Sequence, residues 1–337
     1  MKEAQWWSTA NGKIQCYLCP RYCKIGKGQN GFCFIRKNID GTLQSLAYGS
    51  PCSVNIDPIE KKPLFHFYPG TNILSLGTLG CNLGCLFCQN WSITKIKKAK
   101  EPGKPSRELL PDDVVKAALN NNCPGIAYTY NEPTIWAEYA VDIAKIAHSH
   151  SIKSVMVTNG YITKEAFHDV YDNIDGANVD LKSFNEHFYR KYAAAHIDPV
   201  LQALLALKKE TNVWFEITTL LIPGLNDNDE ETKKLCAWIL NELGPDIPLH
   251  FTAFHPDYKM HDRGPTPAET LEHARYIAMQ CGIHFVYVGN VSSNSANTYC
   301  PQCNKLLIQR GWHSIVRNEL IDGKCSCGEA IPGRWMK

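Results

Sequence analysis

The chain has 337 residues, with 35 lysines and arginines, 33 aspartates and glutamates, and a formal net charge of +2. This length allows one large domain with appendages or two ordinary domains. The near-neutral charge argues against nucleic acid or an anionic membrane as an obligatory partner. No apolar run approaches the roughly 18 residues of a membrane span, and residues 1–7 do not resemble a leader peptide, so we expect a cytoplasmic protein without a membrane partner.

Apolar stretches with strand character alternate with helical patterns between residues 72 and 288. The predicted strands cover residues 72–78, 125–130, 151–158, 177–181, 213–221, 249–254 and 284–288. The predicted helices cover residues 111–120, 134–149, 164–172, 198–210, 227–243 and 267–281. This alternation is typical of βα units on a parallel sheet, so we expect an α/β fold in the form of a partial (β/α) barrel. The active sites of such barrels lie at the carboxyl ends of the strands.

Fifteen cysteines mark the organisation of the chain, because most of them fall into three groups. In a reducing compartment, closely spaced cysteines indicate metal ligation more than disulfides. We therefore predict a Cys-rich N-terminal extension over residues 1–70, the barrel core over residues 71–290 and a zinc-ribbon-like tail over residues 291–337.

The first group consists of Cys16, Cys19, Cys23 and Cys33. Four thiolates complete a tetrahedral site, and their spacing fits either zinc or a second iron–sulfur cluster. An iron–sulfur cluster here would relay electrons towards the central cysteines. Zinc would only stabilise an extension that has little core of its own.

The second group, Cys81, Cys85 and Cys88, directly follows the first strand of the βα region. A 4Fe-4S cluster held by three cysteines keeps one iron open to a small molecule, whereas structural zinc requires a fourth ligand. Gly80 and Gly84 suit a loop whose backbone wraps closely around inorganic sulfide. The alternative is a zinc site or a site that only carries electrons.

The last group, Cys300, Cys303, Cys325 and Cys327, has the pattern of a zinc ribbon. Its second pair is one residue shorter than the usual C-x-x-C. Either both cysteines of that pair bind zinc or His313 replaces one of them.

The pattern C-x-x-x-C-x-x-C with Phe87 before the last cysteine resembles the radical S-adenosylmethionine (radical SAM) superfamily. The whole chain resembles its pyruvate formate-lyase activating enzyme-like group, and most closely the radical SAM member of the AmmeMemoRadiSam system. The segments that carry the resemblance are residues 16–21, 57–64, 81–88 and 128–133 and the final cysteines.

This resemblance implies an oxidoreductase that uses a 4Fe-4S cluster and S-adenosylmethionine. In the family, the open iron binds the amino and carboxylate groups of this cofactor, and an injected electron yields a 5'-deoxyadenosyl radical. The radical then abstracts hydrogen from a substrate, which here is an unidentified protein or small molecule; activation of a glycyl-radical enzyme is one such reaction. The resemblance also implies an electron donor such as ferredoxin or flavodoxin.

The residues that the resemblance assigns to cofactor binding lie in the central loop or at strand ends: Phe87, Asn131, Glu132, Thr158, Asn159, Asp180, Lys182 and His255. Each of the polar ones has a simpler interpretation, such as a carboxylate at a helix start for Glu132 or a core-edge histidine for His255. The sequence alone does not indicate which residues are catalytic.

A second hypothesis is a non-catalytic iron–sulfur and zinc protein that transfers electrons. Such a protein needs no cofactor pocket, so Glu132, Lys182 and His255 at three separate strand ends argue against it. The two hypotheses differ in whether the protein cleaves S-adenosylmethionine.

Overall fold

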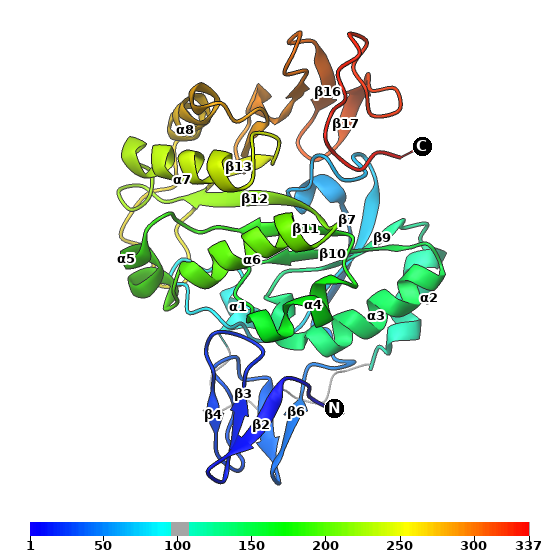
Figure 1. The fold of residues 1–337 in the computed structure, drawn as a ribbon, viewed down its shortest axis with the longest axis vertical. Helices are drawn as coiled ribbons and strands as arrows, with labels where there is room; N and C mark the ends of the chain where they lie inside the picture. Colours follow the sequence, from blue (N-terminus) through cyan, green and yellow to red (C-terminus); the bar gives the residue numbers. More distant parts are fainter. Residues whose placement is uncertain (96–107, 337) are drawn as a thin grey trace. The chain divides into compact units, whose positions relative to one another are not determined.

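The structure is a computed structural model that describes residues 1–95 and 108–336 (Figure 1). The chain forms two compact units, each assembled from segments that are distant in sequence. Unit 1 consists of Met1–Asp57, Asn72–Gly176 and Asp198–Val213. Unit 2 consists of Pro58–Thr71, Ala177–Ile197 and Trp214–Lys337.

Unit 1 contains a run of parallel strands, namely β8 (Asn72–Gly77), β9 (Gly125–Tyr128) and β10 (Lys153–Thr158). In their register Leu74 lies opposite Ile126, and Met156 lies opposite Tyr128. Nearly every residue of these strands is buried, which is the pattern of parallel strands covered on both faces. The strand β7 (Ser53–Pro58) stands beside β8 in the sheet order.

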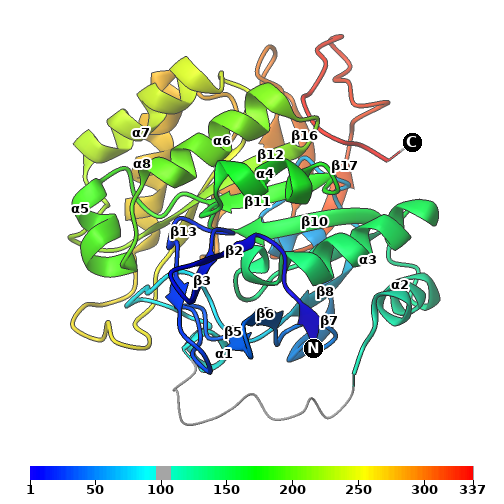
Figure 2. The same ribbon diagram turned by 60° about the horizontal axis from the view of Figure 1, so that its bottom comes forward.

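The helices of unit 1 begin and end close to the predicted positions: α2 (Pro111–Asn120), α3 (Ala137–Ser149), α4 (Lys164–Tyr171) and α6 (Asp198–Glu210). In α2, a proline at the first position and two acidic residues in the first turn favour the helix start. Helix α2 contacts β8 and β9, and α3 contacts β10 (Figure 2).

The N-terminal part of unit 1 folds into two small antiparallel sheets. One orders β1 (Lys2–Glu3), β6 (Thr42–Ser45) and β5 (Arg36–Ile39). The other orders β2 (Trp7–Ala10), β3 (Lys13–Cys16) and β4 (Lys24–Ile25). Asn-Gly and Asp-Gly turns with positive φ connect two of the strand pairs, at Asn11–Gly12 and Asp40–Gly41.

Unit 2 contains a second parallel run of β12 (Trp214–Leu221), β13 (Leu249–Ala253) and β14 (Val286–Gly289), with β11 (Gly176–Asp180) next to β12 in the sheet order. Its long helices are α7 (Asp229–Glu242) and α8 (Ala268–Cys281). The C-terminal strands form an antiparallel sheet of β15 (Thr298–Tyr299), β16 (Leu306–Arg310) and β17 (Ile315–Asn318).

The remaining elements are short. They are η1 (Ile59–Lys61), α1 (Trp91–Thr94), η2 (Pro133–Trp136), α5 (Glu186–Phe188), the π-helical η3 (Tyr189–Ala193) and η4 (Asn294–Ala296).

A buried polar cluster in unit 2 joins strands β12, β13 and β14 to the chain end. The carboxylate of Glu216 accepts a hydrogen bond from the His66 backbone amide (2.7 Å) and lies 2.6 Å from His250 Nε2. His66 Nδ1 lies 2.6 Å from the Pro332 carbonyl oxygen, and His66 Nε2 lies 2.5 Å from the Tyr287 hydroxyl. Burial lowers the pKa of His66 to about 4, so its ring is neutral, donating to Pro332 and accepting from Tyr287.

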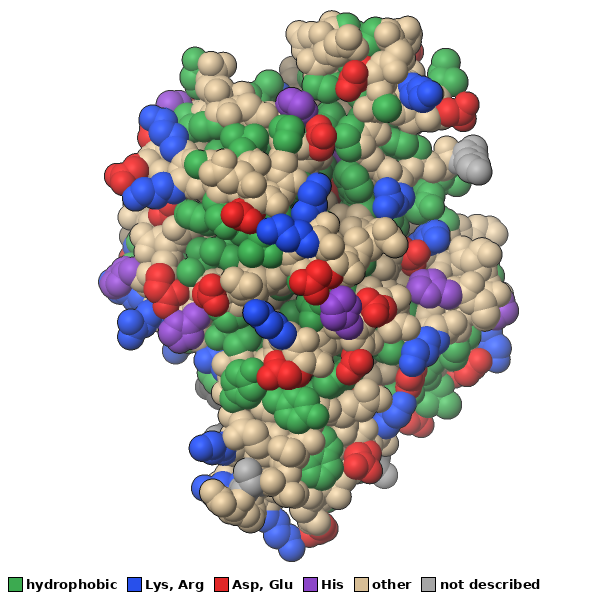
Figure 3. All heavy atoms as spheres, viewed as in Figure 1, with side chains coloured by type: hydrophobic (Ala, Val, Ile, Leu, Met, Phe, Trp, Pro, Cys, Tyr) green, Lys and Arg blue, Asp and Glu red, His purple; other side chains and the backbone are tan. Residues whose placement is uncertain are grey.

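The α/β class and the parallel arrangement of strands are confirmed. Within the described residues, neither run of strands closes into a barrel. Of the helices that the structure describes, none is long and apolar enough to cross a bilayer. On the face drawn in Figure 3, basic and acidic side chains are interspersed, in agreement with the small net charge.

Candidate functional site

The central cysteines lie in the loop between β8 and α1. Cys85 is buried, and Cys81 and Cys88 are half-buried. The Leu83 backbone amide donates to the Sγ of Cys81 (3.4 Å), and the Sγ of Cys88 lies 3.1 Å from the hydroxyl of Thr94. Backbone amides and hydroxyls around sulfur are the usual environment of thiolates that bind iron–sulfur clusters.

The side chain of Asn131 holds this loop in place from the end of β9. Its Oδ1 accepts from the Thr78 backbone amide (3.1 Å), while its Nδ2 donates to the carbonyl oxygens of Leu79 (3.3 Å) and Gly80 (3.0 Å). The same Oδ1 accepts from Trp136 Nε1 at 3.2 Å. Asn131, predicted to contact the cofactor, therefore positions the loop that carries the cysteines.

Asn82 connects the loop to the end of β10. Its buried Nδ2 donates to the Tyr161 carbonyl oxygen (2.8 Å), and its Oδ1 accepts from Asn159 Nδ2 (2.9 Å). Asn159 Nδ2 also lies 4.0 Å from the Sγ of Cys81. Sequence reasoning did not identify Asn82 as a site residue, and its only signal was its place directly after Cys81.

Glu132 is buried between the ends of β9 and β10. One carboxylate oxygen accepts from the Thr134 amide (2.9 Å) and the Thr158 hydroxyl (2.7 Å), and the other accepts from the Asn159 amide (2.8 Å). Burial nevertheless raises the pKa of this carboxyl. The carboxylate of Glu132 caps η2, so Glu132 is a carboxylate at a helix start, as the simpler interpretation predicts. Cofactor binding by Glu132 stays a prediction.

The other predicted cofactor residues occupy separate places. Phe87 is buried in the loop of unit 1. In unit 2, the Lys182 ammonium pairs with the carboxylate of Asp180, the last residue of β11, at 2.6 Å, and both side chains are partly exposed. His255 follows β13 and is exposed, so it is not a core histidine.

The donor set of the central loop fits a 4Fe-4S cluster. Burial raises the pKa of the Cys81 thiol, so its thiolate requires a compensating metal cation. Gly80 has a φ of +88°, and a Cβ at this position would lie 2.2 Å from the Cys33 carbonyl oxygen. Only glycine therefore allows the loop its close approach to the N-terminal cysteines.

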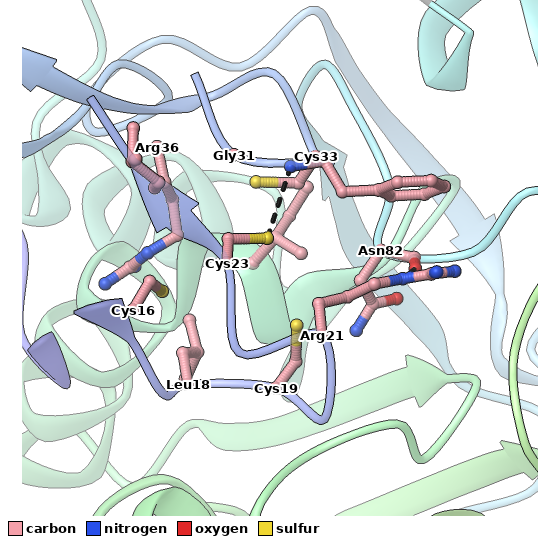
Figure 4. Close-up of a pocket in the computed structure, with 12 residues that line it drawn as sticks. Cys16, Leu18, Cys19, Arg21, Cys23, Gly31, Cys33, Arg36 and Asn82 are labelled. Atoms are coloured by element: carbon pink, nitrogen blue, oxygen red, sulfur yellow. Dashed lines mark hydrogen bonds between the residues drawn. The ribbon is translucent and has the colours of Figure 1, made fainter. Parts of the chain in front are cut away.

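The four N-terminal cysteines line a pocket in unit 1, together with Arg36 (Figure 4). Burial raises the pKa of the Cys23 thiol, and it raises the pKa of Cys33 to about 12. The Arg36 guanidinium is itself buried and pairs with Glu138 at 2.8 Å.

The four C-terminal cysteines lie closer together, with all four sulfur atoms within 4.8 Å of one another. The sulfurs of Cys300 and Cys327 are 3.6 Å apart, as are those of Cys303 and Cys325. Four thiolates on a tetrahedral zinc ion lie about 3.8 Å apart, because each Zn–S bond is about 2.3 Å long. Both cysteines of the short second pair face this site. His313 does not belong to the group, and zinc as its metal stays a prediction.

Comparison with known proteins gives consistent results. Residues 76–236 match the model of the radical SAM superfamily. An uncharacterized protein of Methanocaldococcus jannaschii is 44% identical over 98% of this chain and 99% of its own length. The 4-hydroxyphenylacetate decarboxylase activating enzyme of Clostridium scatologenes is 28% identical over 37% of this chain, and the match spans only 41% of that enzyme. A radical SAM methyltransferase of Sphaerobacter thermophilus shares the fold, with a TM-score of 0.51 and 18% identity over 71% of each chain.

Proposed function

The chain belongs to the radical SAM superfamily, and on this premise we propose that Cys81, Cys85 and Cys88 hold the 4Fe-4S cluster at which it cleaves S-adenosylmethionine. When bound, the cluster and cofactor supply a 5'-deoxyadenosyl radical for hydrogen abstraction. The observation that carries the proposal is a loop with three thiols at the carboxyl end of β8. Three thiols for four irons provide one open coordination position.

The residues around the loop orient it rather than react. Asn131 fixes the loop backbone through its carbonyl and amide groups, and Asn159 lies beside the Cys81 sulfur. Because these amides are held by other hydrogen bonds, they keep the thiol geometry constant before the cofactor arrives. Such preorganisation suits a site whose reactive species must meet one substrate atom.

We assign cofactor binding to the residues that the family resemblance names in the central loop and at strand ends. In this assignment the buried Phe87 packs against the adenine, the ammonium of the cofactor lies near Asn131 and Glu132, and Thr158 and Asn159 contact the cofactor at the end of β10. Asp180 and Lys182 provide an acceptor and a cation for its polar groups, with Lys182 meeting the carboxylate. His255 contacts the adenosine moiety.

The substrate of the proposed reaction is a protein. The supporting observation is the similarity to the activating enzyme of 4-hydroxyphenylacetate decarboxylase, whose name describes action on another enzyme. Activation of a glycyl-radical enzyme is the specific reaction that this similarity favours. The single electron for each cleavage comes from a donor protein such as ferredoxin or flavodoxin.

The test is anaerobic cleavage of S-adenosylmethionine by the reconstituted, reduced protein, with 5'-deoxyadenosine quantified. We expect cleavage by the wild type and by Cys123→Ala, which removes a buried thiol that belongs to none of the three cysteine groups. Cys81→Ala should abolish the product. Absence of cleavage by a wild type with an intact central cluster would refute the proposal and favour the electron-transfer protein.

A further inference from the structure

The two groups of four cysteines differ in how closely their sulfur atoms approach. The C-terminal sulfurs lie within 4.8 Å of one another, as a single tetrahedral ion requires. In the part of the chain that the structure describes, no three of the N-terminal sulfurs meet the same limit. Thiolates on an iron–sulfur cluster bind different irons and are therefore farther apart than thiolates on one ion.

The N-terminal sulfurs also surround a pocket instead of meeting at a point. Figure 4 shows the sulfur atoms of Cys16, Cys19, Cys23 and Cys33 around this space, and three of these cysteines are buried. The other lining residues include the apolar Leu18, Ile25, Phe32 and Ile135. An apolar shell around several separated thiols suits a polynuclear cluster, whose charge is spread over many atoms.

Two groups around the pocket offer hydrogen-bond donors to such a cluster. The Phe32 backbone amide donates to the Sγ of Cys23 at 3.4 Å. Arg36 lines the pocket and is only 2% exposed, yet its Nε has no partner among the described residues. A buried donor without an acceptor is costly, and a cluster sulfur would provide the missing acceptor.

The pocket shares a wall with the central loop. Asn82, the residue after Cys81, lines the pocket, and its carbonyl oxygen accepts from Arg21 Nε at 2.8 Å. On the other side of Cys81, Gly80 packs so closely on the Cys33 carbonyl that a Cβ would overlap it. The residues on both sides of Cys81 thus touch the N-terminal site.

We propose that Cys16, Cys19, Cys23 and Cys33 hold a second iron–sulfur cluster, and not zinc, and that it relays electrons to the central loop. One electron from a reduced iron–sulfur or flavin donor protein takes this cluster from its 2+ to its 1+ state. The cluster returns to 2+ when the electron moves on, and no bond or proton changes. The relay rests on the proposed function, whereas the identity of the metal does not.

The test uses the full chain with Cys81, Cys85 and Cys88 all changed to alanine, reconstituted anaerobically with iron and sulfide. We expect about four irons and four sulfides per chain to remain, and an electron paramagnetic resonance signal after reduction. Zinc should amount to about one ion per chain, from the C-terminal cysteines. A variant with no iron or sulfide and about two zinc ions per chain would overturn the proposal.

Two comparisons separate the parts of the proposal. Cys16→Ala with Cys19→Ala should lose the second signal but keep the central one. The identity of the N-terminal metal is measured in the triple variant, so that part of the proposal does not depend on whether this double variant folds. In the reduced wild type, neighbouring clusters should couple magnetically, so a spectrum equal to the sum of the two variant spectra would overturn the relay. Retained iron in the triple variant, with no cofactor cleavage by the wild type, would refute the proposed function and leave the second cluster standing.

Discussion

Replacing Gly80 with alanine should weaken unit 1 by an amount that the structure allows us to work out. The left-handed backbone, with φ at +88°, costs alanine about 1–2 kcal/mol. The added Cβ would lie 2.2 Å from the Cys33 carbonyl oxygen and 3.2 Å from a methyl carbon of Ile35, and such overpacking costs about 1–3 kcal/mol more. The expected loss of unfolding free energy is therefore about 2–5 kcal/mol.

Gly12→Ala is the matched control, because Gly12 also has positive φ (+71°) but, within the described residues, an added Cβ meets nothing within 4 Å. Gly12→Ala should lose only the unfolding free energy that the left-handed backbone costs alanine, about 1–2 kcal/mol. Urea denaturation measures both variants, and iron analysis after reconstitution should show loss of iron only for Gly80→Ala. If Gly80→Ala were as stable as Gly12→Ala and bound the full amount of iron, the close contact of Gly80 with the Cys33 carbonyl oxygen would not constrain the loop.

Three further outcomes are expected. Folding lowers the pKa of His66 from 6.5 to about 4, so as the pH falls the imidazole binds a proton in the unfolded chain before it does so in the folded chain. The free energy of unfolding therefore decreases as the pH drops from 6.5 towards 4. His66→Gln should therefore reduce the stability lost between pH 7.5 and 5.5 by about 1 kcal/mol in urea titrations, and an undiminished loss would contradict this. Cys327→Ala should remove bound zinc, measured by elemental analysis, whereas His313→Ala should retain it. Asn131→Ala should destabilise the central loop by about 1–3 kcal/mol and lower the iron content after reconstitution, because buried loop groups lose their partners.

The βα region could be predicted closely from the sequence. The helices α2 and α6 begin and end at the predicted residues, because apolar periodicity and acidic first turns mark them locally. The N-terminal hairpins were not predicted, although Asn11–Gly12 and Asp40–Gly41 are strong turn signals between short strands. Their strands are only four residues long, which is too short for a clear alternation.

The candidate cysteine ligands could be recognised in the sequence, but the side chains that hold their loops in place could not. The cysteine groups are visible because ligands for one site lie close together in sequence. The roles of Asn131 and Asn82 depend on contacts between strand ends that are far apart along the chain, such as the 53 positions between Thr78 and Asn131. Sequence periodicity carries no information about such pairs, so the hydrogen bonds of Asn131 to the loop could not be predicted, while its contact with the cofactor stays a prediction of the family resemblance.

The hydrogen bond between His66 and Pro332 joins residues 266 positions apart, and this separation constrains how the protein matures during synthesis. A ribosome releases Cys16 to Cys33 early, so local folding can shape the N-terminal pocket while most of the chain is still unmade. The residues Pro58–Thr71 of unit 2 must instead wait until Pro332 has been synthesised. Closing so long a loop slows folding, so unit 2 stays incomplete until Pro332 has left the ribosome. A ribosome that stops before Pro332 would release a chain whose N-terminal cysteines are arranged but whose His66 lacks this partner.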